Sequence, residues 1–159
     1  GGGAGGYQSM TGGTGNTPPV SPSQGFPGGS NTGTSEQAGA GGALAAAINT
    51  VFPSPSPPAR GSEGGIGAGT AINLTTMPAP SPTPSTQIGT PGPDAAVRYF
   101  AGGGGGVHNP GGAGGGGNGQ CYPAPGIAGG PGTINTGGGG GTETYTGGSG
   151  IVVIRYRYQ

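Results

Sequence analysis

Large hydrophobic side chains are sparse along this chain and stand singly within long stretches of glycine, serine, threonine and proline. The end of the sequence is the exception, because residues 151–159 are mainly β-branched and aromatic, with two arginines. Such residues favour strands, so we predict a β-strand over about residues 150–158. Its side chains alternate between two faces. One face carries Ile151, Val153, Arg155 and Arg157, and the other carries Val152, Ile154, Tyr156 and Tyr158.

Both faces of this predicted strand are apolar where it begins. We therefore expect residues 151–154 to be buried on both sides, and the arginine and tyrosine end to lie near a rim or a subunit contact. A second strand is predicted over about residues 95–101, where Val97 and Tyr99 repeat the pattern found at the end of the chain. Each copy adjoins a glycine run, so the two strands are expected to bracket one glycine block and to pair in one sheet. The residues expected to serve structure or assembly are Ile151, Val152, Val153, Ile154, Tyr156, Tyr158, Val97 and Tyr99.

Other segments give weaker signals. Alanine-rich residues 38–51 form the one plausible helix, but glycines precede it and a loop is nearly as well supported. Residues 70–77 alternate in part and are compatible with a short strand. Residues 53–60 and 78–93 are proline-rich arms that favour extended polyproline II structure. We interpret both arms as stiff spacers, or as clasps on a neighbouring subunit, rather than as recognition elements.

Glycine dominates the composition, with 46 glycines and 18 prolines among 159 residues, against roughly 12% for both together in typical proteins. Collagen needs glycine at every third position, and the glycine runs at 102–106 and 137–141 exclude that pattern. Two states remain open: a flexible coil, or polyglycine II helices packed side by side, where the missing Cβ lets backbones approach and hydrogen-bond. Low charge favours the packed form. The fold is thus expected to be mostly irregular and β, with little or no helix.

The chain divides at about residue 94. Residues 1–94 form a glycine- and proline-rich region with the two arms, and residues 95–159 form a glycine-rich domain closed by the predicted C-terminal strand. The first residues begin in the middle of a glycine pattern without an initiator methionine, which is compatible with a piece of a longer protein.

Charge excludes several classes of function. Four arginines and four acids are scattered, lysine is absent, and the net charge is zero, so no basic stripe is present to neutralise nucleic-acid phosphates. No apolar run is long enough to span a bilayer, and no secretory signal is visible. A single cysteine, Cys121, cannot form a bridge within one chain.

Catalytic and metal-binding chemistry finds little support. His108 stands alone, without the His, Cys or Asp cluster of a metal site, and Cys121 has no base partner in the sequence. Glycine-rich matches to nucleotide loops lack the surrounding strand, helix and acid. We therefore expect no enzyme, cofactor or metal. Tyr122 and Tyr145 stand in predicted loops and are the candidates for recognition of a receptor, since tyrosine binds at low entropic cost.

Three stretches together resemble a known family: residues 99–106, 132–141 and 147–156. They are similar to the glycine-rich domain of bacteriophage virion and tail-fibre proteins, of the type found in marine and cyanobacterial phages. The likeness covers roughly residues 95–156, and residues 1–7 resemble an early block of the same domain, whereas the proline-rich arms depart from it. In a related group of fibre-tip adhesins, polyglycine II segments form a sandwich whose loops recognise the host.

The resemblance implies a non-enzymatic structural protein on the extracellular virion surface, in a tail fibre or a receptor-binding fibre tip involved in host attachment. Its expected partners are other virion subunits, with a homo-oligomer, favoured as a trimer, and a host surface receptor, without nucleic acid or membrane insertion. Two alternatives are a capsid-decorating or cementing protein and a bacterial extracellular filament or matrix protein. An ice-binding protein ranks last, since the threonines lack regular rows.

Overall fold

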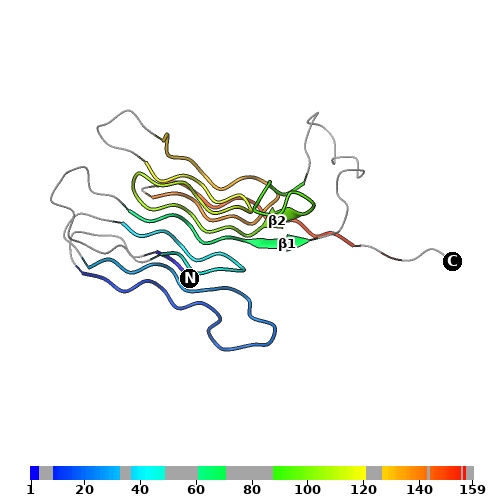
Figure 1. Ribbon diagram of the computed structural model, residues 1–159, viewed down its shortest axis with the longest axis horizontal. Coiled ribbons are helices and arrows are strands. Elements are labelled where there is room, and N and C mark those ends of the chain that lie inside the picture. The colour runs from blue at the N-terminus through cyan, green and yellow to red at the C-terminus, as the bar shows by residue number, and fades with distance from the viewer. Residues whose placement is uncertain are drawn as a thin grey trace.

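The structure, a computed structural model, describes residues 1–3, 9–32, 37–48, 61–70, 88–120, 127–142, 144–154 and 156. Extended segments run side by side along the long axis of the molecule and are joined by turns at its ends (Figure 1). N-terminal segments lie on one side of this stack, and the segments of the C-terminal half lie on the other. No helix occurs among the described residues, so the fold is mostly irregular, as the sequence predicts.

Two short strands lie at one end of the stack (Figure 1). β1 is Ala68–Thr70 and β2 is Arg98–Phe100, and they pair antiparallel with Gly69 opposite Tyr99. Thr90 forms an isolated antiparallel bridge to Tyr99 from the other side. β2 confirms the strand predicted over 95–101. β1 overlaps the segment predicted over 70–77 only at Thr70, and residues 71–77 lie outside the described part.

The helix considered over residues 38–51 is absent from residues 37–48, the part of that segment that the structure describes. These residues instead hydrogen-bond to distant extended segments: the Ala40 amide donates to Gly104 (2.8 Å), and Gly29 donates to the carbonyl of Gly39 (3.0 Å). The glycines in this stretch permit such close contact, and their poor helix propensity removes the competing state. The loop alternative is therefore the correct one here.

The strand predicted over 150–158 is also absent from residues 150–154 and 156, the described part of that segment. Its expected pairing with the first strand is wrong, because β1 and Thr90 occupy the two sides of β2. A strand needs a neighbour for its backbone hydrogen bonds, and none of the described segments supplies one to these residues. The repeated sequence pattern therefore reflects similar composition rather than a shared sheet.

Ala101 and the glycine run at residues 102–106 show how the stack is built. Their backbone amides donate to three other segments, and the direction repeats at every third residue. The bonds are Ala101 to Thr136 (2.8 Å), Gly102 to Gly114 (3.0 Å), Gly103 to Gly65 (2.8 Å), Gly105 to Gly117 (2.9 Å) and Gly106 to Ser62 (2.8 Å). A β-strand repeats every second residue and bonds to two neighbours, whereas a polyproline II helix has three residues per turn. The repeat is that of packed polyglycine II helices.

The neighbouring segment at residues 61–67 repeats the same three-residue spacing. The amides of its first, fourth and seventh residues all donate to carbonyls of residues 107–113, which follow the glycine run at residues 102–106. These bonds are Gly61 to Val107 (2.8 Å), Gly64 to Pro110 (3.1 Å) and Gly67 to Ala113 (2.7 Å). Of the two states that composition leaves open, the structure therefore shows the packed one.

Glycine is required in this stack because neighbouring backbones approach too closely for a side chain. A Cβ built on Gly103 would overlap the carbonyl oxygen of Ala40, and one built on Gly104 would overlap that of Gly140. The buried side chains are correspondingly few. Among the described residues they are Ala38, Ala47, Ile88, Tyr99, Asn31, Ser62 and Thr136. The interior is made mainly of peptide groups, and the Ser62 hydroxyl joins it by accepting a hydrogen bond from the Gly39 amide (2.8 Å).

We expect Gly103→Ala to lower the free energy of unfolding by about 3 kcal/mol, because the new methyl group meets rigid backbone rather than a movable side chain. Gly150→Ala is the matched control, since nothing lies within 4 Å of its Cβ position. That change should be neutral or stabilise by up to about 1 kcal/mol through the unfolded chain. Chemical denaturation of the two variants measures the difference, and equal midpoints would contradict the packed arrangement.

Candidate assembly surface

The described C-terminal residues expose large apolar side chains on one face. Val152 is 85% exposed, Ile154 is 79% exposed and Tyr156 is 80% exposed. Ile151 and Val153 are half-buried. This two-residue alternation is that of an extended chain with one side against the body and the other in solvent. The expected burial of residues 151–154 on both sides is therefore wrong for Val152 and Ile154.

The half-buried side of this segment borders an apolar groove beside the two strands. The groove has a volume of about 370 Å³. Its walls come from the ends of β1 and β2, from the turn at residues 136–137 and from the C-terminal segment itself. The lining residues are Thr70, Phe100, Ala101, Thr136, Gly137, Gly150, Ile151 and Val153.

Ser149 anchors the C-terminal segment to the body. Its carbonyl accepts from the amides of Thr136 (2.9 Å) and Gly137 (2.8 Å), and its hydroxyl oxygen accepts from the amide of Asn135 (2.9 Å). Beyond this point, residues 150–154 make no backbone hydrogen bond to any other described residue. The chain then leaves the stack at the end where the strands lie (Figure 1). Within the described part of the chain, backbone hydrogen bonds therefore hold this segment only at its base, and beyond it the side chains of Ile151 and Val153 border the groove.

Tyr99 and Val97, the other residues predicted to serve structure, pack beside β1. The Tyr99 side chain is 7% exposed, its ring lies against Gly92 and Gly69, and its hydroxyl accepts from the Asp94 amide (3.2 Å). Val97 is half-buried, and its Cγ2 also lies against Gly69. Glycine at positions 69 and 92 leaves room for the Tyr99 ring.

Sequence reasoning missed the role of the residues around Tyr99. Phe100 lies over Gly89, whose φ of 75° is a backbone conformation that side chains rarely adopt. The Arg98 guanidinium donates to the carbonyls of Gly89 (2.7 Å) and Ile88 (3.4 Å). Phe100 and Arg98 thus hold the chain at residues 88–89, and Phe100 also lines the groove. The signal that could have identified them is their place in a predicted strand beside a glycine run.

Tyr145, one of the two recognition candidates, is half-buried rather than presented to solvent. Its ring lies over Gly129, and its hydroxyl meets the Gln120 side-chain oxygen at 3.5 Å. These contacts are those of packing against a glycine segment. Tyr122, Tyr158 and Cys121 lie outside the described residues.

His108 occupies a turn between two glycine segments. It has a φ of 65°, is half-buried, and its backbone amide donates to Gln120 (3.4 Å). Within the part of the chain that the structure describes, no group of three His, Cys, Asp or Glu side chains is close enough together to hold a metal ion.

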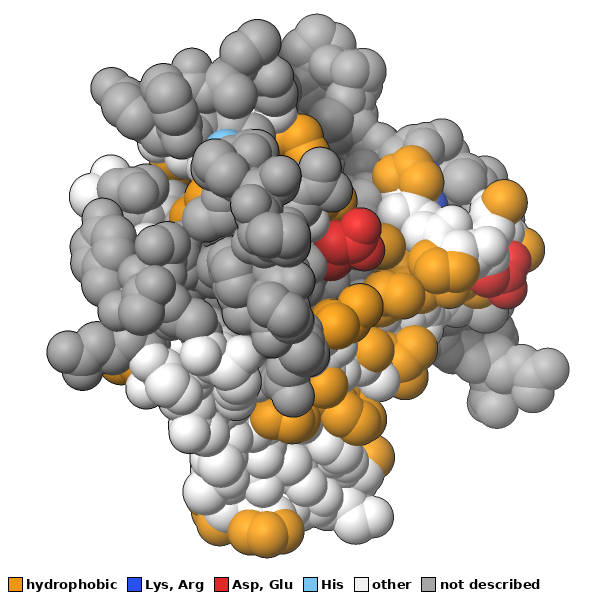
Figure 2. Space-filling view, turned by 60° about the vertical axis from the view of Figure 1, so that its left-hand side comes forward, with side chains coloured by type: hydrophobic (Ala, Val, Ile, Leu, Met, Phe, Trp, Pro, Cys, Tyr) orange, Lys and Arg blue, Asp and Glu red, His pale blue; other side chains and the backbone are white. Residues whose placement is uncertain are grey.

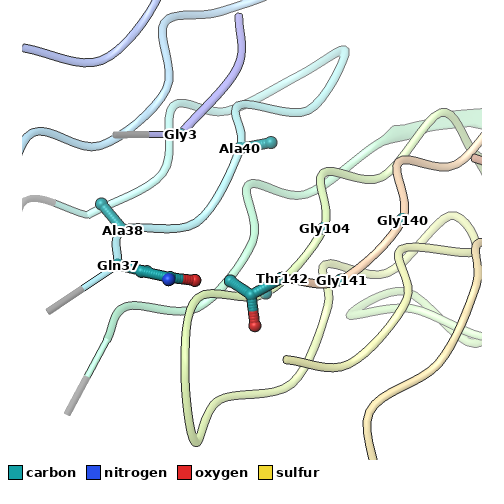
Figure 3. Close-up of a pocket in the computed structure, with 9 residues that line it drawn as sticks. Gly3, Gln37, Ala38, Ala40, Gly104, Gly140, Gly141 and Thr142 are labelled. Atoms are coloured by element: carbon teal, nitrogen blue, oxygen red, sulfur yellow. The ribbon is translucent and has the colours of Figure 1, made fainter. Parts of the chain in front are cut away.

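A second hollow, of about 220 Å³, lies between the segments at residues 37–40 and 140–142. The Gln37 side chain reaches toward Thr142 across its mouth, while glycine backbone forms much of the wall (Figure 3). No acid, imidazole, thiol or amine side chain lines it. Such a wall offers hydrogen bonds from amide, hydroxyl and peptide groups only.

Charged groups are few over the visible surface. Among the described residues that Figure 2 shows on one face, hydrophobic side chains lie beside backbone and uncharged polar groups, with few acidic groups and hardly any basic ones. Among the described residues, no helix is long and apolar enough to cross a membrane. Comparisons of the chain with protein-family models, with curated proteins and with solved structures found no match.

We expect Tyr99→Ala to lower the free energy of unfolding by about 3–5 kcal/mol, because it removes a buried ring that fills the space over two glycines. Tyr99→Phe keeps the ring and loses only the bond from the Asp94 amide, so its cost should be about 1 kcal/mol. Denaturant titration of both variants compares the two. A larger loss for phenylalanine than for alanine would overturn the packing role.

Proposed function

We propose that this chain is a non-enzymatic structural protein of a phage virion, forming part of a tail fibre or fibre tip at the extracellular virion surface. The observation that carries the proposal is the stack of glycine segments joined by backbone hydrogen bonds with a three-residue repeat. Such a stack needs no large hydrophobic core, since peptide groups at the centre bond to several neighbours. Such a stack forms an elongated body with turns at both ends (Figure 1).

The surface chemistry supports a mechanical and presenting role. The two hollows described above are lined by glycine, by apolar side chains and by amide and hydroxyl groups, without titratable side chains. The turns between segments lie at the ends of the stack and are the parts that would meet a host surface (Figure 1). The resemblance of residues 95–156 to glycine-rich virion domains supplies the assignment to a phage, and the geometry supplies the mechanism.

The test is immunogold electron microscopy of phage particles from the native source, with an antibody raised against residues 78–93. We expect label at fibre ends or along fibres. Even label over the heads would replace this role with capsid decoration, and label on cell walls or free filaments would overturn the phage assignment. Particles labelled with pre-immune serum serve as the control for background.

A further inference from the structure

The exposed face of the C-terminal segment is made by Val152, Ile154 and Tyr156, named here the C-terminal apolar face. We propose that a second copy of this chain covers it, with the two C-terminal segments paired antiparallel about a twofold axis at Ile154. This contact does not depend on the virion assignment. It concerns which surface joins two copies, wherever the protein resides.

Two observations show that, among the described residues, this segment has no partner for its exposed face or its backbone. Its three side chains are each at least 79% exposed, and residues 150–154 have no backbone hydrogen bond to other described residues. Pairing with an added strand satisfies backbone donors and acceptors together with the apolar side chains above them. The missing component is therefore an extended chain with apolar side chains on one face.

A second copy fits that description because the face is complementary to itself. When Ile154 sits on the twofold axis, it meets Ile154 of the second copy, and Val152 meets Tyr156. Each of the three exposed side chains then packs beside one of the same three from the second copy, as a twofold contact requires. By sequence count, the same register sets Arg155 opposite Val153 rather than opposite another arginine. A register centred on Val153 would set Tyr156 opposite Gly150. A register centred on Arg155 would set the two copies of this arginine opposite each other.

Charge also favours a second copy over a partner of opposite sign. The chain has no net charge and only four acidic and four basic residues, so two copies do not repel each other. The described apolar face carries no charged group that would select a charged partner. The contact is small: three large side chains from each copy bury on the order of 800 Å² in total, below the roughly 1,200 Å² of a standard interface. Dissociation in the micromolar range is therefore expected.

Light scattering after size exclusion tests the contact across concentrations from about 1 to about 200 µM. Wild type should move from one to two copies over this range. Ile154→Asp should stay a single copy throughout, with the melting temperature of dilute wild type, because the side chain is exposed in one copy. Ile48→Asp, at an exposed isoleucine elsewhere (68%), should pair as wild type does. Wild type that stays a single copy, or Ile154→Asp that pairs normally, would overturn the proposal.

Disulfide formation tests the register. In a Cys121→Ser background, Ile154→Cys should form a cross-linked pair on oxidation, because opposite positions on antiparallel strands lie within reach of a disulfide. Val152→Cys should not, since two copies of that residue are set four positions apart along the strands. Equal cross-linking of both variants would indicate parallel segments around a common axis and would overturn the antiparallel pairing.

The outcomes separate this inference from the proposed function. Labelling of particles reports where the protein resides, and light scattering reports how two copies meet. Labelled fibres with a protein that remains a single copy would contradict the contact alone. A paired protein that labels cell walls would contradict the virion assignment and leave the contact in place.

Discussion

The close approach of one peptide backbone to another is the constraint on which this structure depends. In the glycine run at residues 102–106, backbone amides donate to carbonyls of distant segments, and a Cβ on any of these glycines would overlap backbone atoms of a neighbouring segment. Each hydrogen bond contributes only about 1 kcal/mol net, and glycine loses more conformational freedom on folding than any other residue. The stack is therefore stable only when many such bonds form together. A methyl group added to one glycine therefore disturbs two segments, because the backbone atoms that it would overlap belong to a neighbouring segment with hydrogen bonds of its own.

Side chains matter where the glycine stack ends. At β2, the Tyr99 ring lies on Gly69 and Gly92, and Phe100 lies on Gly89. The aromatic rings there cover backbone instead of other side chains, and this allows two three-residue strands to persist with very little apolar core. The same principle applies to Tyr145 over Gly129. Tyr99, Phe100 and Tyr145 thus act as covers for glycine.

Much of the fold class and little of the arrangement could be predicted from the sequence. Residues 98–100 form a strand as predicted, because Tyr99 and Phe100 are aromatic residues that favour strands. The alanine-rich stretch at 38–51 suggested a helix that residues 37–48 do not form, because hydrogen bonds from this stretch to neighbouring segments of the stack compete with helix formation. The neighbours of each glycine segment could not be predicted from the sequence, because a run of identical residues carries no pattern that sets the register. The C-terminal segment shows the converse limit: its β-branched residues predict a strand, but propensity cannot supply the partner that a strand requires.

Exposed apolar residues elsewhere on the chain differ in kind from the C-terminal face. Leu44 and Ile48 are 57% and 68% exposed, but they belong to a segment already bound into the stack, as the bond from the Leu44 amide to Ile66 (3.0 Å) shows. Single exposed hydrophobic residues of that sort are ordinary on protein surfaces. Val152, Ile154 and Tyr156 are exposed, and residues 150–154 form no backbone hydrogen bond to any other described residue. The chain also has almost no charge to oppose association. An unpaired segment of this composition is an association site by its physical chemistry, and a twofold contact closes it, whereas an open-ended one would lead to uncontrolled growth.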